Sequence, residues 1–423
     1  MNYKLDVIRN KFPALSIKDD KKKRIYFDNP AGTQVSQNVV KAMAECLIES
    51  NANIQGGFET SNRADAILNE SHQSMADFLN ANSSDEIIFG QNMTTLTLHI
   101  SRSIGRSLSA GDEIILSKMD HDANISPWLL LAEDLDLKIK WLSFDTQSFE
   151  FDLSLLDNLI TNRTKLIGVG GASNLLGTIN DIKSISHKAK SVGALSFIDA
   201  VQLAPHVSID VQDIGCDFLV CSAYKFFGPH QGILWGRKEI MQSLKAYKVR
   251  PATSDLPGCF ETGTQSHEGM AGTIAAVNYF VWIGREFAKN YYQEDRFSNK
   301  RTMFIHSALD YLFKYEKTLT DKLINGLENI DNVKIQGITQ KNALNRRLPT
   351  VAFTVKDKNP GLIASALGKE NIFVWSGHSY AIEVVKHLGL YDSGVVRVGP
   401  VHYNSLEEVE EFLVVLENIL PGI

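Results

Sequence analysis

The chain has 423 residues, of which 44% are hydrophobic and 22% charged, and its formal net charge is −6. This length allows two domains, and the composition is that of an ordinary globular protein. The negative charge argues against a nucleic-acid-binding protein, which would show a basic patch or stripe. Residues 18–24 form a short basic run, but acidic residues interrupt it, and we interpret it as solvated surface.

The sequence also lacks the features of a secreted or membrane-spanning protein. The first twenty residues contain no apolar segment of the kind found in secretion signals. The longest apolar runs, such as 275–284, have about ten residues, roughly half of a membrane span. The four cysteines, Cys46, Cys216, Cys221 and Cys259, show no zinc-like or redox-motif spacing. We therefore expect a reduced, cytoplasmic protein.

The first two thirds of the chain alternate short apolar runs with helical patterns. Residues 36–50, with Ser36 as the expected N-cap, and residues 63–81 have helical periodicity. Strands are expected at 24–29, 85–90, 112–117, 138–144, 164–170, 194–200 and 217–223. Apolar runs of this length, separated by helices and turns, are typical of strands buried on both faces of a parallel α/β sheet.

After about residue 285 the pattern changes. A long helix is expected at 301–330, strands at 332–338, 350–355, 371–377 and 395–401, and a closing helix at 405–420. The fold prediction is therefore a large, mostly parallel-sheet α/β domain followed by a smaller α+β domain. We expect the large domain at 22–285 and the small domain at 286–423, with residues 1–21 packing against the small domain.

Ligands of such sheets bind at the carboxyl ends of the strands. Several expected strand ends carry polar side chains: Thr94 and Thr95 before a helix, His121, Ser173 and Asn174, Asp199 and Gln202, and Ser222 and Lys225. Lys225 is the only charged residue in the segment 221–232, and it follows a strand that reads as buried. Desolvation disfavours the charged form of a lysine and leaves a nucleophilic amine.

Together these residue types suit pyridoxal phosphate. A helix N-terminus with Thr94 and Thr95 offers donors to a phosphate. His121 can stack on the ring, Asp199 can pair with the protonated ring nitrogen, and Lys225 can form the Schiff base.

Each feature taken alone has a simpler explanation. A single lysine at a strand end is usually structural, and a Thr-Thr pair before a helix is usually a cap. His121 could ligate a metal with Asp120 and Asp122, but no second cluster with metal-ligand spacing supports a metal site. The Gly-Val-Gly-Gly run at 168–171 is not a dinucleotide fingerprint, because Ser173 replaces the third glycine and no helix follows.

The order of these motifs resembles the class V aminotransferase family of fold-type I pyridoxal-phosphate enzymes, and in particular cysteine desulfurase-like proteins. The similarity runs from the segment at Tyr26–Gln34 to the segment at Val396–Asn404. It implies that Lys225 binds the cofactor covalently, that Asp199 pairs with the ring nitrogen, and that His121 stacks on the ring. By the same resemblance Gln202 contacts the ring hydroxyl, Asn174 lies near cofactor and substrate, Arg397 pairs with the substrate carboxylate, and Thr94, Thr95 and Ser222 hold the phosphate.

The segment 261–269 resembles the family's loop that crosses to a neighbouring subunit. By this resemblance Thr264 would contact the partner's phosphate, which implies a homodimer with shared active sites. Without the resemblance, the same segment reads as a surface turn.

Two positions depart from the family pattern. Tyr224 precedes Lys225 where the family usually has histidine, and we expect the cofactor to tolerate this change. In the segment 376–381, Tyr380 stands where desulfurases carry their nucleophilic cysteine. Sulfur transfer needs a thiolate, and a tyrosine hydroxyl cannot carry a persulfide. Tyr380 and His378 could act as acid or base at the substrate, or could serve the structure of the loop.

The functional prediction is therefore a pyridoxal-phosphate enzyme that acts on Cα or Cβ of a small amino acid, as a lyase, decarboxylase, racemase or aminotransferase. One alternative is a true cysteine desulfurase that uses Cys259 or an external thiol. Another is a non-catalytic binding protein that has kept the fold.

Overall fold

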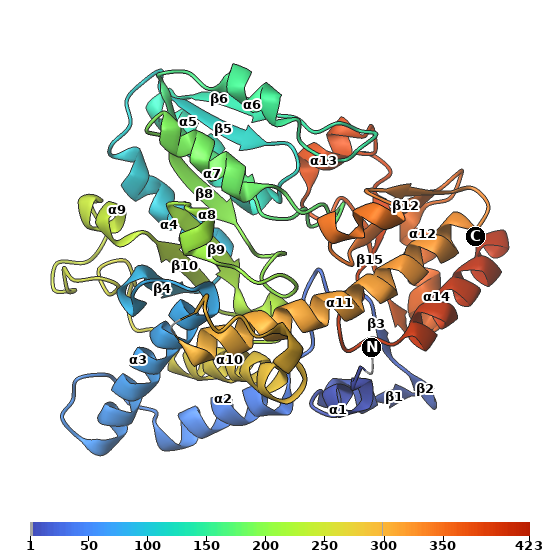
Figure 1. Ribbon diagram of the computed structural model, residues 1–423, viewed down its shortest axis with the longest axis horizontal. Coiled ribbons are helices and arrows are strands. Elements are labelled where there is room, and N and C mark those ends of the chain that lie inside the picture. Colours follow the sequence, from blue (N-terminus) through green and yellow to red (C-terminus); the bar gives the residue numbers. More distant parts are fainter. Residues whose placement is uncertain (1–2, 298) are drawn as a thin grey trace.

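The computed structural model describes residues 3–297 and 299–423. A seven-stranded sheet with the order β4-β10-β9-β8-β7-β5-β6 forms the centre of its larger part (Figure 1). The strands are β4 (Ile87–Gly90), β5 (Glu113–Ser117), β6 (Lys138–Leu142), β7 (Thr164–Gly170), β8 (Leu195–Asp199), β9 (Phe218–Ser222) and β10 (Gly232–Gly236). Neighbours from β6 to β9 pair in parallel, and β10 runs antiparallel to both β9 and β4. The mostly parallel sheet is confirmed, and β10 is the strand that the sequence analysis missed.

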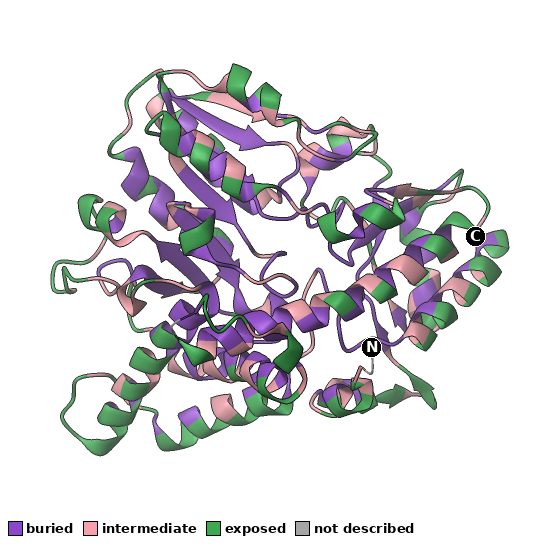
Figure 2. Ribbon diagram, viewed as in Figure 1, coloured by how far each residue is buried: buried purple, intermediate pink, exposed green. Residues whose placement is uncertain are grey.

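Helices cover both faces of this sheet. They are α2 (Gln37–Glu49), α3 (Glu59–Leu79), α4 (Met93–Gly105), α5 (Ser126–Leu135), α6 (Leu153–Leu159), α7 (Ile182–Ser191), α8 (Val211–Ile214), α9 (Lys238–Ser243) and α10 (His267–Phe287). One apolar cluster joins the sheet to α3, α7 and α10, and a second joins it to α4 and α5, so the strands are buried on both sides (Figure 2). Ser36 is the N-cap residue of α2, as expected, but its side chain makes no capping hydrogen bond to the helix. Within the described residues, no helix combines the length and the apolarity needed to cross a membrane.

The smaller part contains a four-stranded antiparallel sheet with the order β11-β12-β15-β14. Its strands are β11 (Val333–Gln336), β12 (Val351–Val355), β14 (Trp375–Gly377) and β15 (Val395–Val398), and its helices are α11 (Lys300–Glu328), α12 (Pro360–Lys369), α13 (Ile382–His387) and α14 (Leu406–Ile419). In the pairing of β14 with β15, Trp375 lies directly opposite Arg397. The side chains of such register partners leave the sheet on the same face.

The N-terminal segment lies against the smaller part. The ring of Tyr3, just before α1 (Leu5–Arg9), stacks on Tyr315 of α11 with 3.6 Å between ring centroids, and Arg9 forms a 2.8 Å ion pair with Glu408 of α14. A short hairpin, β1 (Lys18–Asp19) and β2 (Lys22–Lys23), follows.

The next strand, β3 (Ile25–Tyr26), pairs in parallel with β13 (Ile372–Phe373). Ile25 and Phe27 also belong to the apolar cluster of the smaller part. We therefore propose that residues 22–28 belong with the small domain, although their position in the chain had suggested the large one.

Candidate active site

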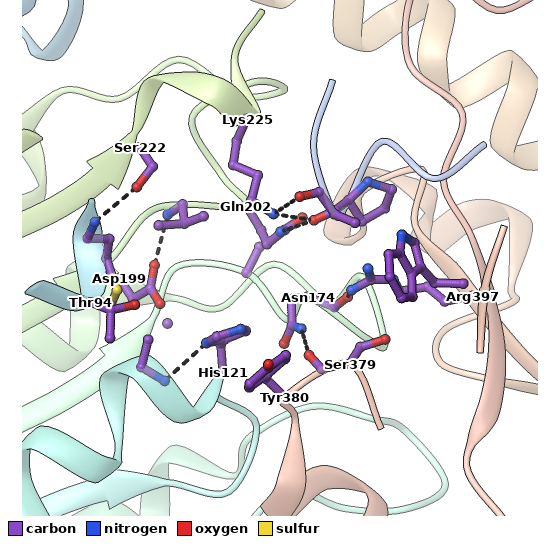
Figure 3. A pocket seen from close by; sticks show the side chains of 18 of the residues that line it. Thr94, His121, Asn174, Asp199, Gln202, Ser222, Lys225, Ser379, Tyr380 and Arg397 are labelled. Carbon is purple, nitrogen blue, oxygen red and sulfur yellow. Dashed lines mark hydrogen bonds between the residues drawn. The ribbon is translucent and has the colours of Figure 1, made fainter. Parts of the chain in front are cut away.

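The carboxyl ends of the central strands face the smaller part across a cavity of about 400 Å³. Figure 3 shows Lys225, Asp199 and His121 around one part of the cavity, Tyr380 beside His121, and Arg397 across the cavity from Asp199. Nine of the expected site residues line this cavity: Thr94, His121, Asn174, Asp199, Gln202, Ser222, Lys225, Tyr380 and Arg397. Strands that are distant in the sequence thus bring together the side chains that the motifs had singled out.

Lys225 ends a 3₁₀ turn that follows β9, and only 8% of the residue is exposed. Its Nζ donates hydrogen bonds to the carbonyl oxygens of Pro30 at 2.7 Å and Ala31 at 2.8 Å. Burial, and secondly the positive charge of Arg397, lower the pKa of Lys225 to about 7. A large fraction of the amine is therefore neutral and nucleophilic at neutral pH.

Asp199 closes β8 and is 7% exposed. Its Oδ1 accepts a 2.9 Å hydrogen bond from the amide of Val201, and burial raises its pKa to about 6. A buried carboxylate of this kind gains from a cationic partner. Gln202, three residues later, donates from Nε2 to the carbonyl of Pro30 at 2.9 Å, so Gln202 and Lys225 hold the same turn.

His121 follows β5 and presents a neutral ring. Its Nδ1 accepts a 3.0 Å hydrogen bond from the amide of Ala123, which places the proton of the neutral ring on Nε2. Burial, followed by the charges of Lys225 and Arg397, lowers the pKa of His121 to about 4. The phenol ring of Tyr380 stacks on this imidazole, with 5.4 Å between centroids and 20° between planes.

Two hydrogen bonds fix the loop that carries Tyr380. Asn174 donates from Nδ2 to the carbonyl of Ser379 at 2.7 Å, and the amide of Asp122 donates to the carbonyl of Tyr380 at 2.8 Å. Ser379 and Tyr380 have φ angles of 48° and 58°, a left-handed conformation that costs energy in residues other than glycine. The surrounding contacts therefore hold Tyr380 in one orientation.

Arg397 lies on β15, is 5% exposed, and donates from Nη1 to the carbonyl of Asn174 at 2.9 Å. Burial lowers its pKa to about 10, so it stays a cation at neutral pH. The Oδ1 atom of Asn174 is buried without a hydrogen-bond partner within the described chain. The two residues thus offer a fork of donors and one free acceptor to a ligand.

The N-terminus of α4 offers hydrogen-bond donors to an anion in the cavity. Asn92 caps the helix by accepting a 2.9 Å hydrogen bond from the amide of Thr95, and the amide of Met93 donates to Oγ of Ser222 at 3.1 Å. The amide of Thr94 has no partner among residues 3–297 and 299–423, and the hydroxyl proton of Ser222 is free to donate. Free donors at a helix N-terminus suit a phosphate.

One expected phosphate contact of this chain's own site, Thr95, is not brought to this cavity. The hydroxyl of Thr95 donates to Oδ1 of Asn92 at 2.9 Å, and Thr95 lines a neighbouring cavity of about 490 Å³. Thr264 lines the same second cavity and is exposed. Thr94 and Thr95 are adjacent on the helix, and consecutive helical residues point in different directions, so only Thr94 faces the Lys225 cavity.

None of the four cysteines, all of which lie in the described residues, lines the Lys225 cavity. Cys259 is only 7% exposed and packs in the apolar cluster beneath α4 and α5. Burial raises the pKa of its thiol.

The residues present fit pyridoxal phosphate. Thr94 and Ser222 offer uncommitted donors for a phosphate, and Asp199 offers a buried carboxylate for a cationic ring nitrogen. The unpartnered Oδ1 of Asn174 and the neutral amine of Lys225 lie in the same cavity. Sequence reasoning missed the carbonyls of Pro30 and Ala31, and it also missed Trp375, because backbone acceptors and lone aromatic residues leave no motif.

The chain is similar over nearly its whole length to known proteins of one family. The family described as Aminotransferase class-V matches residues 25–412. An aminotransferase-like protein of Gibberella zeae is 33% identical, with 99% of each chain covered. A probable cysteine desulfurase of Borreliella burgdorferi is 30% identical and covers 99% of this chain and 96% of its own.

Among solved structures, a cysteine desulfurase of Thermococcus onnurineus NA1 in its apo form superposes with a TM-score of 0.87 at 28% identity, covering 100% of this chain and 99% of its own. The cysteine desulfurase CsdA of Escherichia coli, at 22% identity and a TM-score of 0.83, shares the fold over 100% of this chain and 99% of its own. The match over nearly the whole chain establishes that this protein belongs to the class V aminotransferase family of pyridoxal-phosphate-dependent enzymes.

Proposed function

We propose that this protein binds pyridoxal phosphate and acts at Cα or Cβ of a small, free α-amino acid without passing sulfur to a thiol of its own. The observation that carries the proposal is that the buried Lys225 amine, whose pKa is lowered to about 7, and the buried Arg397 guanidinium line one cavity that no cysteine lines. The guanidinium suits a carboxylate, and the amine suits a proton transfer nearby.

The chain's own residues have distinct tasks in this proposal. Arg397 binds and orients the substrate carboxylate. Lys225 first holds the cofactor and then accepts and returns the proton at Cα, a task for which a pKa near 7 is well matched. The bound cofactor would supply an electron sink for the Cα carbanion, and Asp199 would keep its ring nitrogen protonated. His121 covers the ring with a neutral face.

Tyr380 is the residue that argues against cysteine desulfuration. It occupies the loop position at which desulfurases carry their cysteine, and its hydroxyl cannot form a persulfide. A lyase, decarboxylase, racemase or aminotransferase reaction fits such a site. Desulfuration with an external thiol is the second candidate, supported by the desulfurase names of the relatives. Burial and a raised thiol pKa argue against Cys259 as the nucleophile.

A spectral and product screen tests the proposal. The purified protein, incubated with pyridoxal phosphate and desalted, should show a visible absorption band that changes when a substrate amino acid is added. The product identifies the reaction. An oxo acid indicates transamination, carbon dioxide indicates decarboxylation, the inverted enantiomer indicates racemisation, and ammonia with an elimination product indicates a lyase. A protein that takes up no cofactor, or whose band responds to no amino acid, contradicts the proposal and favours the non-catalytic alternative. Alanine and sulfide from cysteine, released equally by Cys259→Ala, would instead establish an external-thiol desulfurase.

We also propose that two copies of the chain assemble with shared active sites. Thr264 is exposed on its own chain and lies outside the Lys225 cavity, which supports a role in the site of a neighbour. Light scattering should give a mass twice that of one chain. A monomeric mass for the active protein would contradict this assembly.

A further inference from the structure

The residue opposite Arg397 on the small sheet is a tryptophan. Trp375 and Arg397 are register partners in the antiparallel pair of β14 and β15, so their side chains leave the sheet on the same face. Both residues line the cavity that holds Lys225. A substrate carboxylate held by Arg397 therefore lies beside the indole ring.

Two aromatic residues of this cavity keep much of their surface uncovered. Trp375 is 53% exposed and Tyr380 is 65% exposed, although both line the cavity. Aromatic rings contribute most when their faces are removed from water. Exposed rings on the wall of an enclosed site are surfaces that a ligand can cover.

The charged side chains that line the cavity all have other tasks. Among the described residues that line it, the only ones of the Asp, Glu, Lys or Arg types are Asp199, Lys225 and Arg397. In the proposed function these groups serve the cofactor ring, the proton at Cα and the substrate carboxylate. The lining beside Arg397 consists of Trp375, Ser376, Gly377, His378, Ser379 and Tyr380. A charged substrate side chain placed there would be desolvated without a carboxylate, lysine or arginine partner from this chain, whereas an apolar side chain could cover the two aromatic rings.

Contacts within the protein fix the backbone of the residues that carry these two aromatic rings. The contacts of Asn174 and Asp122 hold the backbone of Ser379 and Tyr380 in a left-handed conformation, and Tyr380 stacks on His121 as a result. Trp375 is fixed at its backbone by the ladder of β14 and β15. The backbone of both residues is thus fixed, and the ring of Tyr380 also stacks on His121.

We propose that the substrate is an α-amino acid with an uncharged, apolar side chain larger than a methyl group, and that Trp375 determines this specificity by covering that side chain. The inference rests on the proposed function, because it takes Arg397 as the carboxylate anchor. It goes beyond that function in naming the substrate class and the residue that selects it.

The test uses the full-length protein loaded with pyridoxal phosphate. Spectral titration gives dissociation constants for alanine, leucine, phenylalanine, aspartate and lysine. Exchange of the Cα hydrogen in deuterated water, followed by NMR, gives an independent rate. The variants are Trp375→Ala and, as a matched control, Tyr391→Ala, which removes an aromatic ring of similar exposure (50%) that does not line the cavity.

We expect the wild-type protein to bind leucine or phenylalanine at least tenfold more tightly than aspartate or lysine. Trp375→Ala should weaken leucine or phenylalanine binding by about tenfold, the order expected for losing burial of one apolar side chain, and should change alanine binding by less than about twofold. Tyr391→Ala should change none of these constants.

Equal weakening of alanine and phenylalanine in Trp375→Ala would overturn the inference, since it would mean that the indole only shields Arg397 from water. Preference of the wild-type protein for aspartate, lysine or alanine would overturn it as well, while leaving the proposed function intact. A spectrum that responds to no amino acid would instead contradict the proposed function.

Discussion

Replacement of Lys225 by alanine is expected to lower kcat/KM by at least about a thousandfold, because in the proposed function this one side chain both binds the cofactor and transfers the proton at Cα. The visible absorption band of the loaded protein should shift to that of free or non-covalently bound cofactor. Steady-state kinetics and the spectrum of Lys225→Ala, each against wild type, measure the two effects. Retention of the band and of more than a tenth of the activity would contradict the assignment.

Two controls separate chemistry from folding in this variant. A small primary amine added to Lys225→Ala should restore part of the activity, which it cannot do for a collapsed site. In the cofactor-free wild type, burial lowers the pKa of Lys225 to about 7, so the amine is protonated below that pH and neutral above it. Acylation of Lys225, followed by mass spectrometry, should therefore rise through pH 7.

Replacement of Arg397 by alanine is expected to lower kcat/KM by about a hundredfold or more, mainly through KM, because a carboxylate would enter a buried site without its cationic partner. Arg397→Lys should recover only part of the loss, since an ammonium keeps the charge but not the planar fork of donors. Kinetics of both variants with the substrate found in the amino-acid screen measure the difference.

A substrate analogue provides the control for Arg397. The amine that corresponds to the substrate without its carboxylate should bind wild type and Arg397→Ala equally well. If Arg397→Ala weakens both ligands to the same extent, Arg397 supports the loop of Asn174 rather than the carboxylate, because its Nη1 also donates to the carbonyl of Asn174.

Much of the large domain could be read from the sequence because its strands are buried on both faces and appear as short, bounded apolar runs. β5, β7, β8 and β9 lie within the predicted ranges, and the polar residues after them meet at one edge. The sequence did not predict β10, because Gly232–Gly236 follows the Phe-Phe-Gly-Pro turn closely and has a glycine at each end. Gly232 lies against the start of α4, where a Cβ would come within 2.5 Å of the carbonyl carbon of Asn92.

Other parts of the site depend on contacts that no local pattern encodes. Arg347 reads as a surface arginine between Arg346 and Leu348, yet it is 1% exposed and donates to the carbonyls of Leu176 and Thr350. It thereby ties the loop after Asn174 to the small domain. The side chain of Thr95 faces the second cavity, because Thr95 follows Thr94 directly on the helix and therefore points in a different direction.

The pairing of β3 with β13 also affects the order in which the chain can fold during synthesis. Asn29, just after β3, donates from Nδ2 to the carbonyl of Gly399, which lies 370 residues further along the chain. During synthesis the large sheet can assemble while β3 still has no partner, because β13 and Gly399 leave the ribosome after all seven strands of that sheet. The segment before the turn at Pro30 and Ala31, which receives the amine of Lys225, thus gains its contact with Gly399 only after Lys225 has been made. A nascent chain would therefore contain Lys225 before the seat for that lysine is complete.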